Sequence, residues 1–480
     1  MNNPYETLDI LITGGTLLTM EPPGDIVADP VIGIRDGRIS FVEEGGATRG
    51  ELPEAREVLD GSGCLVMPGL VNTHTHLPMV LFRGLADDLP LMRWLNDHIF
   101  PAEERFIDRE TVYAGTQLAI AEMILSGTTT FCDGYFFESS VARAAVEAGM
   151  RGLVAQGFID FPAPDRQSSA EKATVAESFV ENWRGRSPLV TPALICHSPY
   201  TCSPETLRSI KAVARRTGVA FLIHLAETRE EVRMIRERYG KTPVRHLADL
   251  DLLDENTIAA HCIWLDENEL DLLAEHKVKV AHVPESNMKL GAGVAPVPAM
   301  LSRGIAVGLG TDGCASNNDL DLFGEMRMAA MLHKVFSADP TVMTAGKVVE
   351  MATSGGARVL GMEDRIGSVI PGKEADIILV DMKRPHLTPL YNPFSHLVYA
   401  ASGADVAASI IGGRIVMKDR RLLQLNLAAI MPEVRRIGKQ VVQAGFHRPA
   451  SPFRSDPIQY GQSGSPPGDG SGPGLAPLNS

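Results

Sequence analysis

Four stretches of the chain end an apolar run with histidine or aspartate, the residue types that bind divalent metals. The first holds His74 and His76, which lie two residues apart, so on a strand both imidazoles would project to the same side. The other three end in His224, His261 and Asp312. One pair of histidines is a weak signal, because two polar residues on a solvated strand look the same. Four runs that end in this way have no equally simple explanation, and together they predict a metal site.

The donor types indicate which metal and which chemistry to expect. Imidazoles with one carboxylate suit Zn²⁺, with Fe²⁺ as the alternative. Catalytic zinc keeps one position open for water and lowers the pKa of that water toward about 7, which favours hydrolysis at neutral pH. Glu227, three residues after His224, could move protons beside such a site. Its plainer interpretation is an acid at the start of a helix, because Glu227–Glu231 is a charged run.

The elements that must position these side chains alternate between strands and helices. Longer segments with helical periodicity, such as Glu110–Leu125, Pro204–Arg216 and Asp319–Lys334, separate short apolar ones. The alternation predicts a (β/α)8 barrel, in which the strand ends converge on one mouth. A doubly wound sheet is the competitor, and periodicity alone does not exclude it. The eight candidate strands are Leu70–His76, Thr128–Asp133, Arg151–Ile159, Leu189–His197, Ala220–Leu225, Thr257–His261, Val278–His282 and Ile305–Asp312.

Strand and hairpin patterns at both ends of the chain predict a second, smaller domain. Asp9–Ile12 and a hairpin around Asp36-Gly37 near the start are echoed by Ala375–Val380 and Ala408–Val416. We therefore expect a small β-sandwich built from residues 1–68 and 367–447, with the last part including a closing helix. The barrel would span residues 69–366. Residues 448–480 are rich in Pro, Gly and Ser, and we expect them to be disordered.

Composition excludes several classes of protein. The chain has 480 residues and a net charge of −14, which argues against a broad nucleic-acid surface. It has no apolar run of about 18 residues, so we expect no membrane span. The first residues have no Lys or Arg and no apolar core, so no secretory signal is expected. The six cysteines form no C-x-x-C and are interpreted as free thiols in a cytoplasmic protein.

The motifs around these residues resemble the amidohydrolase superfamily. The resemblance rests on His-Thr-His at 74–76, His-Leu-Ala-Glu at 224–227, Ala-His-Cys at 260–262 and Gly-Thr-Asp at 310–312, and it covers nearly the whole chain. Within the superfamily the chain is most similar to the 5-methylthioadenosine/S-adenosylhomocysteine deaminases. The segments that carry this closer resemblance are Pro101–Glu104, Ser126–Phe131, His197–Ser203 and Pro284–Leu290. It implies hydrolysis of adenosine-type nucleosides to inosyl products and ammonia.

The resemblance also implies a role for each site residue. The fourth strand ends in Leu194–His197 without the lysine that two-metal members often modify, which implies one metal per subunit. The family suggests a homo-oligomer of unspecified size that acts on a small-molecule nucleoside. His74, His76, His224 and Asp312 would bind the metal. Glu227 and Asp312 would both shuttle protons and contact the substrate, and His261 would stabilise the attacking water or the alkoxide. Glu103 and His197 would contact the ribose.

Several alternatives stay open. The family is expected to place arginines near the amino-acid end of the substrate, and here the third strand holds Arg151 and, further along, Gln156. Methylthioadenosine, S-adenosylhomocysteine, 5'-deoxyadenosine and adenosine are all candidate substrates. Another amino-purine or a triazine is a second possibility, and a non-catalytic assembly protein of the same fold is a remote one. Asp88–Leu95 could form an apolar wall of the site or a subunit interface, and His282 has no assigned role.

Overall fold

The computed structural model describes most of the chain. The described residues are 7–21, 25–45, 52–165, 168 and 171–446. The segment predicted to be a disordered tail, 448–480, lies outside them. No helix within the described ranges is both long enough and apolar enough to cross a membrane.

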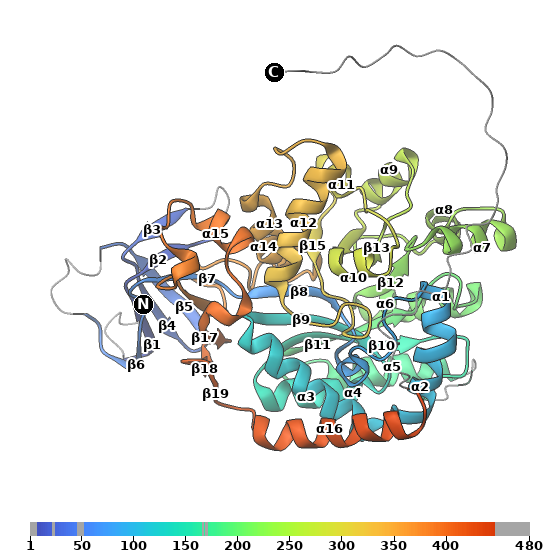
Figure 1. Ribbon diagram of the computed structural model, residues 1–480, viewed down its shortest axis with the longest axis horizontal. Helices are drawn as coiled ribbons and strands as arrows, with labels where there is room; N and C mark the ends of the chain where they lie inside the picture. Colours follow the sequence, from blue (N-terminus) through green and yellow to red (C-terminus); the bar gives the residue numbers. More distant parts are fainter. Residues whose placement is uncertain (1–6, 22–24, 46–51, 166–167, 169–170, 447–480) are drawn as a thin grey trace, which may run out of the picture. The chain divides into compact units, whose positions relative to one another are not determined.

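Eight parallel strands in consecutive order form the central sheet (Figure 1). Each strand pairs with the next one along the chain, and a bridge between Thr75 and Asp312 joins the first strand to the segment after the last. This order and closure confirm the predicted (β/α)8 barrel and exclude a doubly wound sheet. The strands are β8 (Leu70–Thr75), β9 (Thr128–Tyr135), β10 (Arg151–Phe158), β11 (Val190–Cys196), β12 (Phe221–Leu225), β13 (Thr257–His261), β14 (Lys279–His282) and β15 (Val307–Leu309).

Helices follow the barrel strands, and the last described helix is Leu427–Gln443. The predicted helix Asp319–Lys334 begins three residues later, at Leu322, because the Asp321 side chain accepts the N–H of Phe323 and caps the helix there. The helical elements are η2 (Leu77–Phe82), α1 (Leu91–Trp94), η3 (Leu95–Ile99), α2 (Phe100–Phe106), α3 (Arg109–Leu125), α4 (Glu138–Ala148), α5 (Lys172–Trp183), α6 (Pro204–Thr217), α7 (Arg229–Tyr239), α8 (Pro243–Asp249), α9 (Glu267–Glu275), α10 (Pro284–Lys289), α11 (Val297–Ser302), α12 (Leu322–Ser337), α13 (Ala345–Ala352), α14 (Ser354–Val359), η4 (Pro385–Leu387), α15 (Pro393–Tyr399), η5 (Gly403–Asp405) and α16 (Leu427–Gln443).

Two further sheets are built from the ends of the chain. One has the order β5-β4-β1-β6 and the other β19-β18-β17-β16-β7-β2-β3, so N-terminal β7 pairs with C-terminal β16 (Figure 1, blue beside orange). Ile10 and Ile34 of the first sheet share a buried cluster with Val66, Ile377 and Ile410 of the second. This packing confirms the predicted small sandwich. Its strands are β1 (Leu8–Thr13), β2 (Thr16–Leu18), β3 (Ile26–Ala28), β4 (Val31–Arg35), β5 (Arg38–Glu43), β6 (Ala55–Asp60), β7 (Cys64–Pro68), β16 (Ile377–Asp381), β17 (Val406–Ile411), β18 (Arg414–Lys418) and β19 (Arg421–Leu422).

A buried ion network ties the barrel to the sheet that contains β16. Arg151 begins β10 with 1% of its side chain exposed, and its Nε lies 2.7 Å from Asp376 Oδ2. Its Nη2 lies 2.7 Å from Glu374 Oε2, and the Gly412 N–H donates to Asp376 Oδ1 at 2.7 Å. Because active sites lie at the carboxyl ends of barrel strands, Arg151 at the amino end of β10 is far from a substrate. It is therefore not a substrate arginine.

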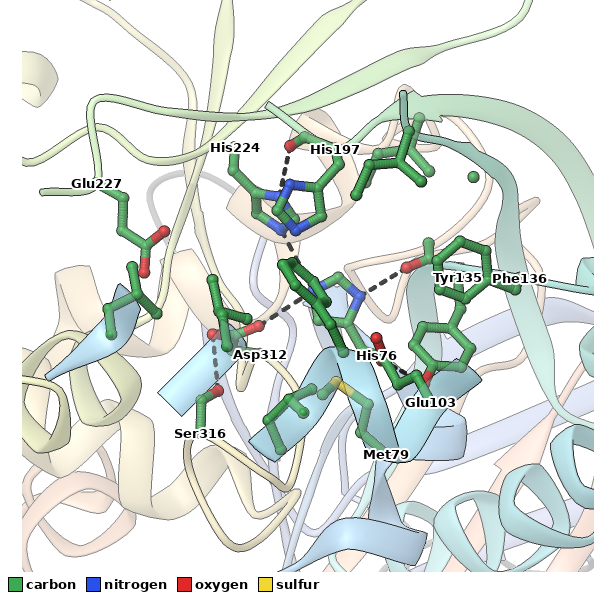
Figure 2. Close-up of a pocket in the computed structure, with 18 of the residues that line it drawn as sticks. His76, Met79, Glu103, Tyr135, Phe136, His197, His224, Glu227, Asp312 and Ser316 are labelled. Atoms are coloured by element: carbon green, nitrogen blue, oxygen red, sulfur yellow. Dashed lines mark hydrogen bonds and ion pairs between the residues drawn. The ribbon is translucent and has the colours of Figure 1, made fainter. Parts of the chain in front are cut away.

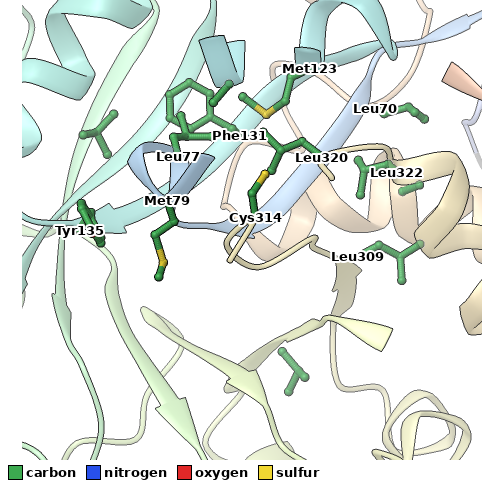
Figure 3. Packing of buried hydrophobic residues seen from close by; sticks show 14 of the residues in the cluster. Leu70, Leu77, Met79, Met123, Phe131, Tyr135, Leu309, Cys314, Leu320 and Leu322 are labelled. Atoms are coloured by element: carbon green, nitrogen blue, oxygen red, sulfur yellow. The ribbon is translucent and has the colours of Figure 1, made fainter. Parts of the chain in front are cut away.

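The loop after β8 is anchored in the main core. η2 folds back from that strand, so Leu77 and Met79 pack among buried residues that include Met123 of α3, Phe131 of β9 and Cys314 after β15 (Figure 3). Such packing holds the strand end and its histidines in one place. All six cysteines are buried and unpaired, as predicted.

Candidate functional site

The three histidines predicted to bind metal lie together at the mouth of the barrel. His74 lies in β8 and His76 directly follows that strand, whereas His224 lies in β12, four strands further along the barrel. His76 and His224 point toward each other in the cavity (Figure 2). His224 Nε2 lies 3.1 Å from His74 Nε2 and 3.2 Å from His76 Nε2. The structure thus brings three ring nitrogens from two distant segments to one point, and they form a candidate metal site.

The ring nitrogens of His76 and His224 that face each other need a positive charge between them. His76 Nδ1 donates to the Gly134 carbonyl and His224 Nδ1 donates to the His197 carbonyl, each at 2.6 Å. In a neutral ring that donates from Nδ1, Nε2 carries a lone pair, so these two Nε2 atoms would repel one another unless a proton or a metal cation lay between them.

Burial lowers the pKa of His74 to about 4 and that of His224 well below its ordinary value, which favours neutral rings at these two positions. Burial opposes a charge on His76 as well, but the hydrogen bond and charge of Asp312 raise its pKa to about 9, so a metal cation bound there would replace the proton of His76.

Asp312 completes the donor set. Its Oδ1 lies 3.3 Å from His76 Nε2 and 3.5 Å from His74 Nε2. Its Oδ2 accepts hydrogen bonds from the hydroxyls of Ser286 at 2.6 Å and Ser316 at 2.9 Å. One oxygen therefore faces the histidines while the other is held by two hydroxyls. Burial alone would raise the pKa of Asp312, but the hydrogen bonds and charges of the two histidines hold it well below its usual range.

Glu227 and His261 face each other across the same centre. The Oε2 atom of Glu227 lies 3.9 Å from His261 Nε2, and both side chains are buried. His261 Nδ1 lies 2.9 Å from Asn287 Oδ1, which fixes Nδ1 as the protonated nitrogen because a carbonyl oxygen only accepts. Burial raises the pKa of Glu227, which favours the protonated form and suits a carboxyl that gives a proton to a substrate.

A cavity of about 790 Å³, part of it open to solvent, leads to this centre. Glu103 and His197 line it, and their contact with a ribose stays a prediction. Tyr135 also lines it and donates a 2.5 Å hydrogen bond to Glu103 Oε1, a contact that the sequence did not predict. Burial raises the pKa of Glu103 to about 7, although the Tyr135 hydroxyl opposes the shift. Glu103 rather than its neighbour Glu104 is therefore the carboxyl in the cavity.

One wall of the cavity is apolar. Leu91 and Trp94 of α1 line it with Leu95, Phe100 and Phe136, so the segment Asp88–Leu95 does contribute a wall, one of its two predicted uses. The charged residues among the lining are acidic, and none of the described residues that line the cavity is Lys or Arg. The cavity therefore favours a neutral, partly apolar ligand over an anion.

His282 is not among the described residues that line the cavity. It ends β14, is fully buried, and its Nε2 lies 3.2 Å from Nε2 of His333 in α12. Ser316 also lines the cavity, where its hydroxyl holds Asp312.

Comparisons with known proteins agree with this site. A family model described as the amidohydrolase family matches residues 65–416. A 5-methylthioadenosine/S-adenosylhomocysteine deaminase of Syntrophobacter fumaroxidans is 50% identical over 433 residues, covering 90% of this chain and 98% of the relative. A 5'-deoxyadenosine deaminase of Methanosarcina mazei is 44% identical over 436 residues, with 90% and 98% covered.

A solved structure supports the same relationship. The crystal structure of an adenosine deaminase from Xanthomonas campestris with bound zinc has a TM-score of 0.89 and 38% identity, covering 92% of this chain and all of that one. The resemblance seen in the motifs is thereby confirmed over nearly the whole described fold. The chain belongs to the amidohydrolase family, among the relatives named 5-methylthioadenosine/S-adenosylhomocysteine deaminases.

Proposed function

We propose that this protein is a zinc-dependent aminohydrolase that deaminates adenosine-type nucleosides, with methylthioadenosine and/or S-adenosylhomocysteine giving the inosyl products and ammonia. The observation that carries the proposal is the convergence of His74, His76, His224 and Asp312 with Glu227 at one barrel mouth. This donor set and its neighbouring acid suit hydrolysis at an amino-bearing ring carbon.

The residues around the metal divide the proton transfers. When bound, the zinc ion would supply water with a pKa near 7 and polarise it for attack on C6 of the purine. Asp312 accepts the proton of the attacking water. Glu227 protonates N1 of the ring as C6 is attacked and then helps to protonate the leaving amine. His261 donates from Nε2 in its doubly protonated form to oxygen as negative charge develops there, because its Nδ1–H is already bonded to Asn287 and, against the effect of burial, the charges of Glu227 and Asp312 raise its pKa.

The remaining polar groups of the cavity bind the sugar. Glu103 accepts hydrogen bonds from ribose hydroxyls, and Tyr135 holds that carboxyl in place. His197, which directly follows β11, contacts the ribose as well. The 5' substituent then lies along the apolar wall of Leu91, Trp94 and their neighbours, which suits an alkylthio group or a methyl group better than a charged one.

Three finer points belong to the proposal. The metal is one zinc ion per chain, with Fe²⁺ as the alternative, because β11 ends in Cys196-His197 without a bridging lysine. The protein acts in the cytoplasm, which six free cysteines support. It forms a homo-oligomer, as the family resemblance implies, and binds neither nucleic acid nor membrane, in keeping with a net charge of −14.

An ammonia-release assay of the zinc-loaded protein tests the function. The panel holds methylthioadenosine, S-adenosylhomocysteine, 5'-deoxyadenosine, adenosine, adenine, guanine and a triazine. We expect release from nucleosides, loss of at least about 10³-fold in Glu227→Gln, and unchanged zinc content in that variant. Release only from free bases or the triazine would reject the nucleoside assignment, and release from nothing would favour a non-catalytic protein.

A further inference from the structure

A second buried carboxylate lies directly behind the proposed proton shuttle. Glu231 stands in the first turn of α7, is 1% exposed, and lies outside the set of residues that line the cavity. Its Oε1 accepts the backbone N–H of Ala226 at 2.9 Å, and its Oε2 accepts that of Glu227 at 2.7 Å. Both carboxylate oxygens of Glu231 therefore bind the backbone of Ala226 and Glu227, the two residues that follow β12.

Helix capping does not account for this side chain. Thr228 already caps α7, because its hydroxyl accepts the N–H of Glu231 at 3.1 Å. An acid at this third helical position ordinarily reaches back to the N–H of the capping residue itself. Glu231 reaches past Thr228 to the two preceding residues instead. Its contacts therefore hold the loop that carries Glu227 rather than the end of the helix.

The loop is strained and tied to the neighbouring strand. Ala226 has φ +52°, a left-handed conformation that is costly for a residue with a side chain. Its carbonyl accepts the N–H groups of Ile263 at 3.1 Å and Trp264 at 3.0 Å, just after His261, which is itself at φ +70°. These bonds and those of Glu231 together set how far the end of β12 lies from the end of β13.

The position of the Glu227 carboxylate depends on the backbone of this loop. Its closest charged partner in the described ranges is His261, whose Nε2 at 3.9 Å is beyond hydrogen-bond distance. We infer that Glu231 is a positioning residue, which fixes the backbone of Glu227 and so aims its carboxylate at the reacting ring. The inference rests on the proposed deaminase function.

Replacing Glu231 with Gln tests the inference, with Glu230→Gln as the matched control. A glutamine offers one acceptor oxygen, so one of the two loop N–H groups would face an amide NH₂. We expect kcat for methylthioadenosine to fall about 100-fold, as for a catalytic group misplaced by about 1 Å, with KM within about threefold and zinc content unchanged. Glu230 pairs with Arg233 on the exposed side of the same helix, and its variant should keep the wild-type kcat.

Two further readouts separate positioning from a general loss of structure. In a Glu227→Gln background, Glu231→Gln should cause no further loss, because it acts only through the residue already neutralised. The amides of Ala226 and Glu227 should exchange hydrogen faster in Glu231→Gln than in Glu230→Gln, whatever the activity.

The contrary outcomes are equally specific. A wild-type kcat in Glu231→Gln, an equal further loss in the Glu227→Gln background, or unchanged amide exchange would each overturn the positioning role. If Glu231→Gln does not fold, Glu231→Asp replaces it, since it keeps both oxygens but retracts them, and a wild-type kcat there overturns the role. A wild-type protein that releases no ammonia rejects the function instead, and amide exchange then still decides the positioning claim.

Discussion

Tyr135 and Glu103 join two sides of the cavity through one hydrogen bond, in which the phenol donates to Glu103 Oε1 at 2.5 Å. Tyr135 ends β9 and Glu103 lies in α2, so the contact fixes a carboxyl from a loop helix against a rigid barrel strand. Both residues are buried. A carboxyl held in this way presents its remaining lone pairs to the ribose in one orientation.

Removing that phenol should weaken nucleoside binding. In Tyr135→Phe, Glu103 loses its donor, and we expect KM for methylthioadenosine to rise about 10-fold, corresponding to about 1.4 kcal/mol for a hydrogen bond to a charged group, with a smaller change in kcat. Tyr113→Phe is the control, because Tyr113 also donates to a glutamate, Glu147, but on an exposed helix surface. Equal KM values in the two variants would contradict the role of Tyr135.

The pH dependence of kcat/KM should reflect the ionisation of Glu103 and its hydrogen bond with Tyr135. Because burial raises the pKa of Glu103 to about 7, its carboxylate form, which accepts from the ribose, is lost as the pH falls below 7. The Tyr135 hydroxyl stabilises that charged form, so Tyr135→Phe should move the acidic limb of the profile to higher pH. A limb that stays in place or moves to lower pH would show that Glu103 does not set it.

The charge of the 5' substituent should govern substrate choice. The described residues that line the cavity include no Lys or Arg, so the carboxylate of S-adenosylhomocysteine would be desolvated without a partner. We expect kcat/KM for methylthioadenosine and 5'-deoxyadenosine to exceed that for S-adenosylhomocysteine by about 30-fold, which corresponds to about 2 kcal/mol. Equal efficiency for all three, measured by ammonia release, would refute the idea that this wall selects neutral groups.

The ion network of Arg151, Asp376 and Glu374, at the amino end of β10, should affect the stability of the protein and not its catalysis. Arg151→Met leaves the buried carboxylate of Asp376 without its guanidinium partner and removes one of the two arginines that pair with the half-buried Glu374, which should cost about 3–5 kcal/mol in urea unfolding of the zinc-loaded protein. Arg233→Met, on an exposed helix surface, should cost less than about 1 kcal/mol. A similar small loss in both variants, or a changed KM in Arg151→Met, would disagree with this assignment.

The sequence predicted most of the fold because each barrel strand is buried on both faces. Buried parallel strands are short apolar runs, such as Phe221–Leu225, and turns or helices bound them clearly. Asp319–Lys334 was misplaced at its start because apolar periodicity does not mark a cap, which depends on the side chain of Asp321. The exact domain boundaries stay a prediction.

The predicted site residues came together because strand ends of a barrel must meet. His74, His76, His224 and Asp312 needed only the order of the strands to converge. The residues that support them were missed for a physical reason: Tyr135, Ser286, Asn287 and Glu231 act through single hydrogen bonds between segments distant in sequence or through backbone amides. Arg151 could have been set aside from the sequence, because it begins the predicted strand Arg151–Ile159 and the carboxyl ends of barrel strands form the mouth.

Titration of the metal-free protein with zinc tests the central claim most directly. Protein stripped by a chelator and supplied with methylthioadenosine should release no ammonia. Added Zn²⁺ should restore the rate linearly up to one equivalent per chain, and His224→Ala should bind zinc more weakly and stay inactive. Full activity without metal, a break at two equivalents, or zinc binding without any ammonia release would contradict a single-metal nucleoside deaminase.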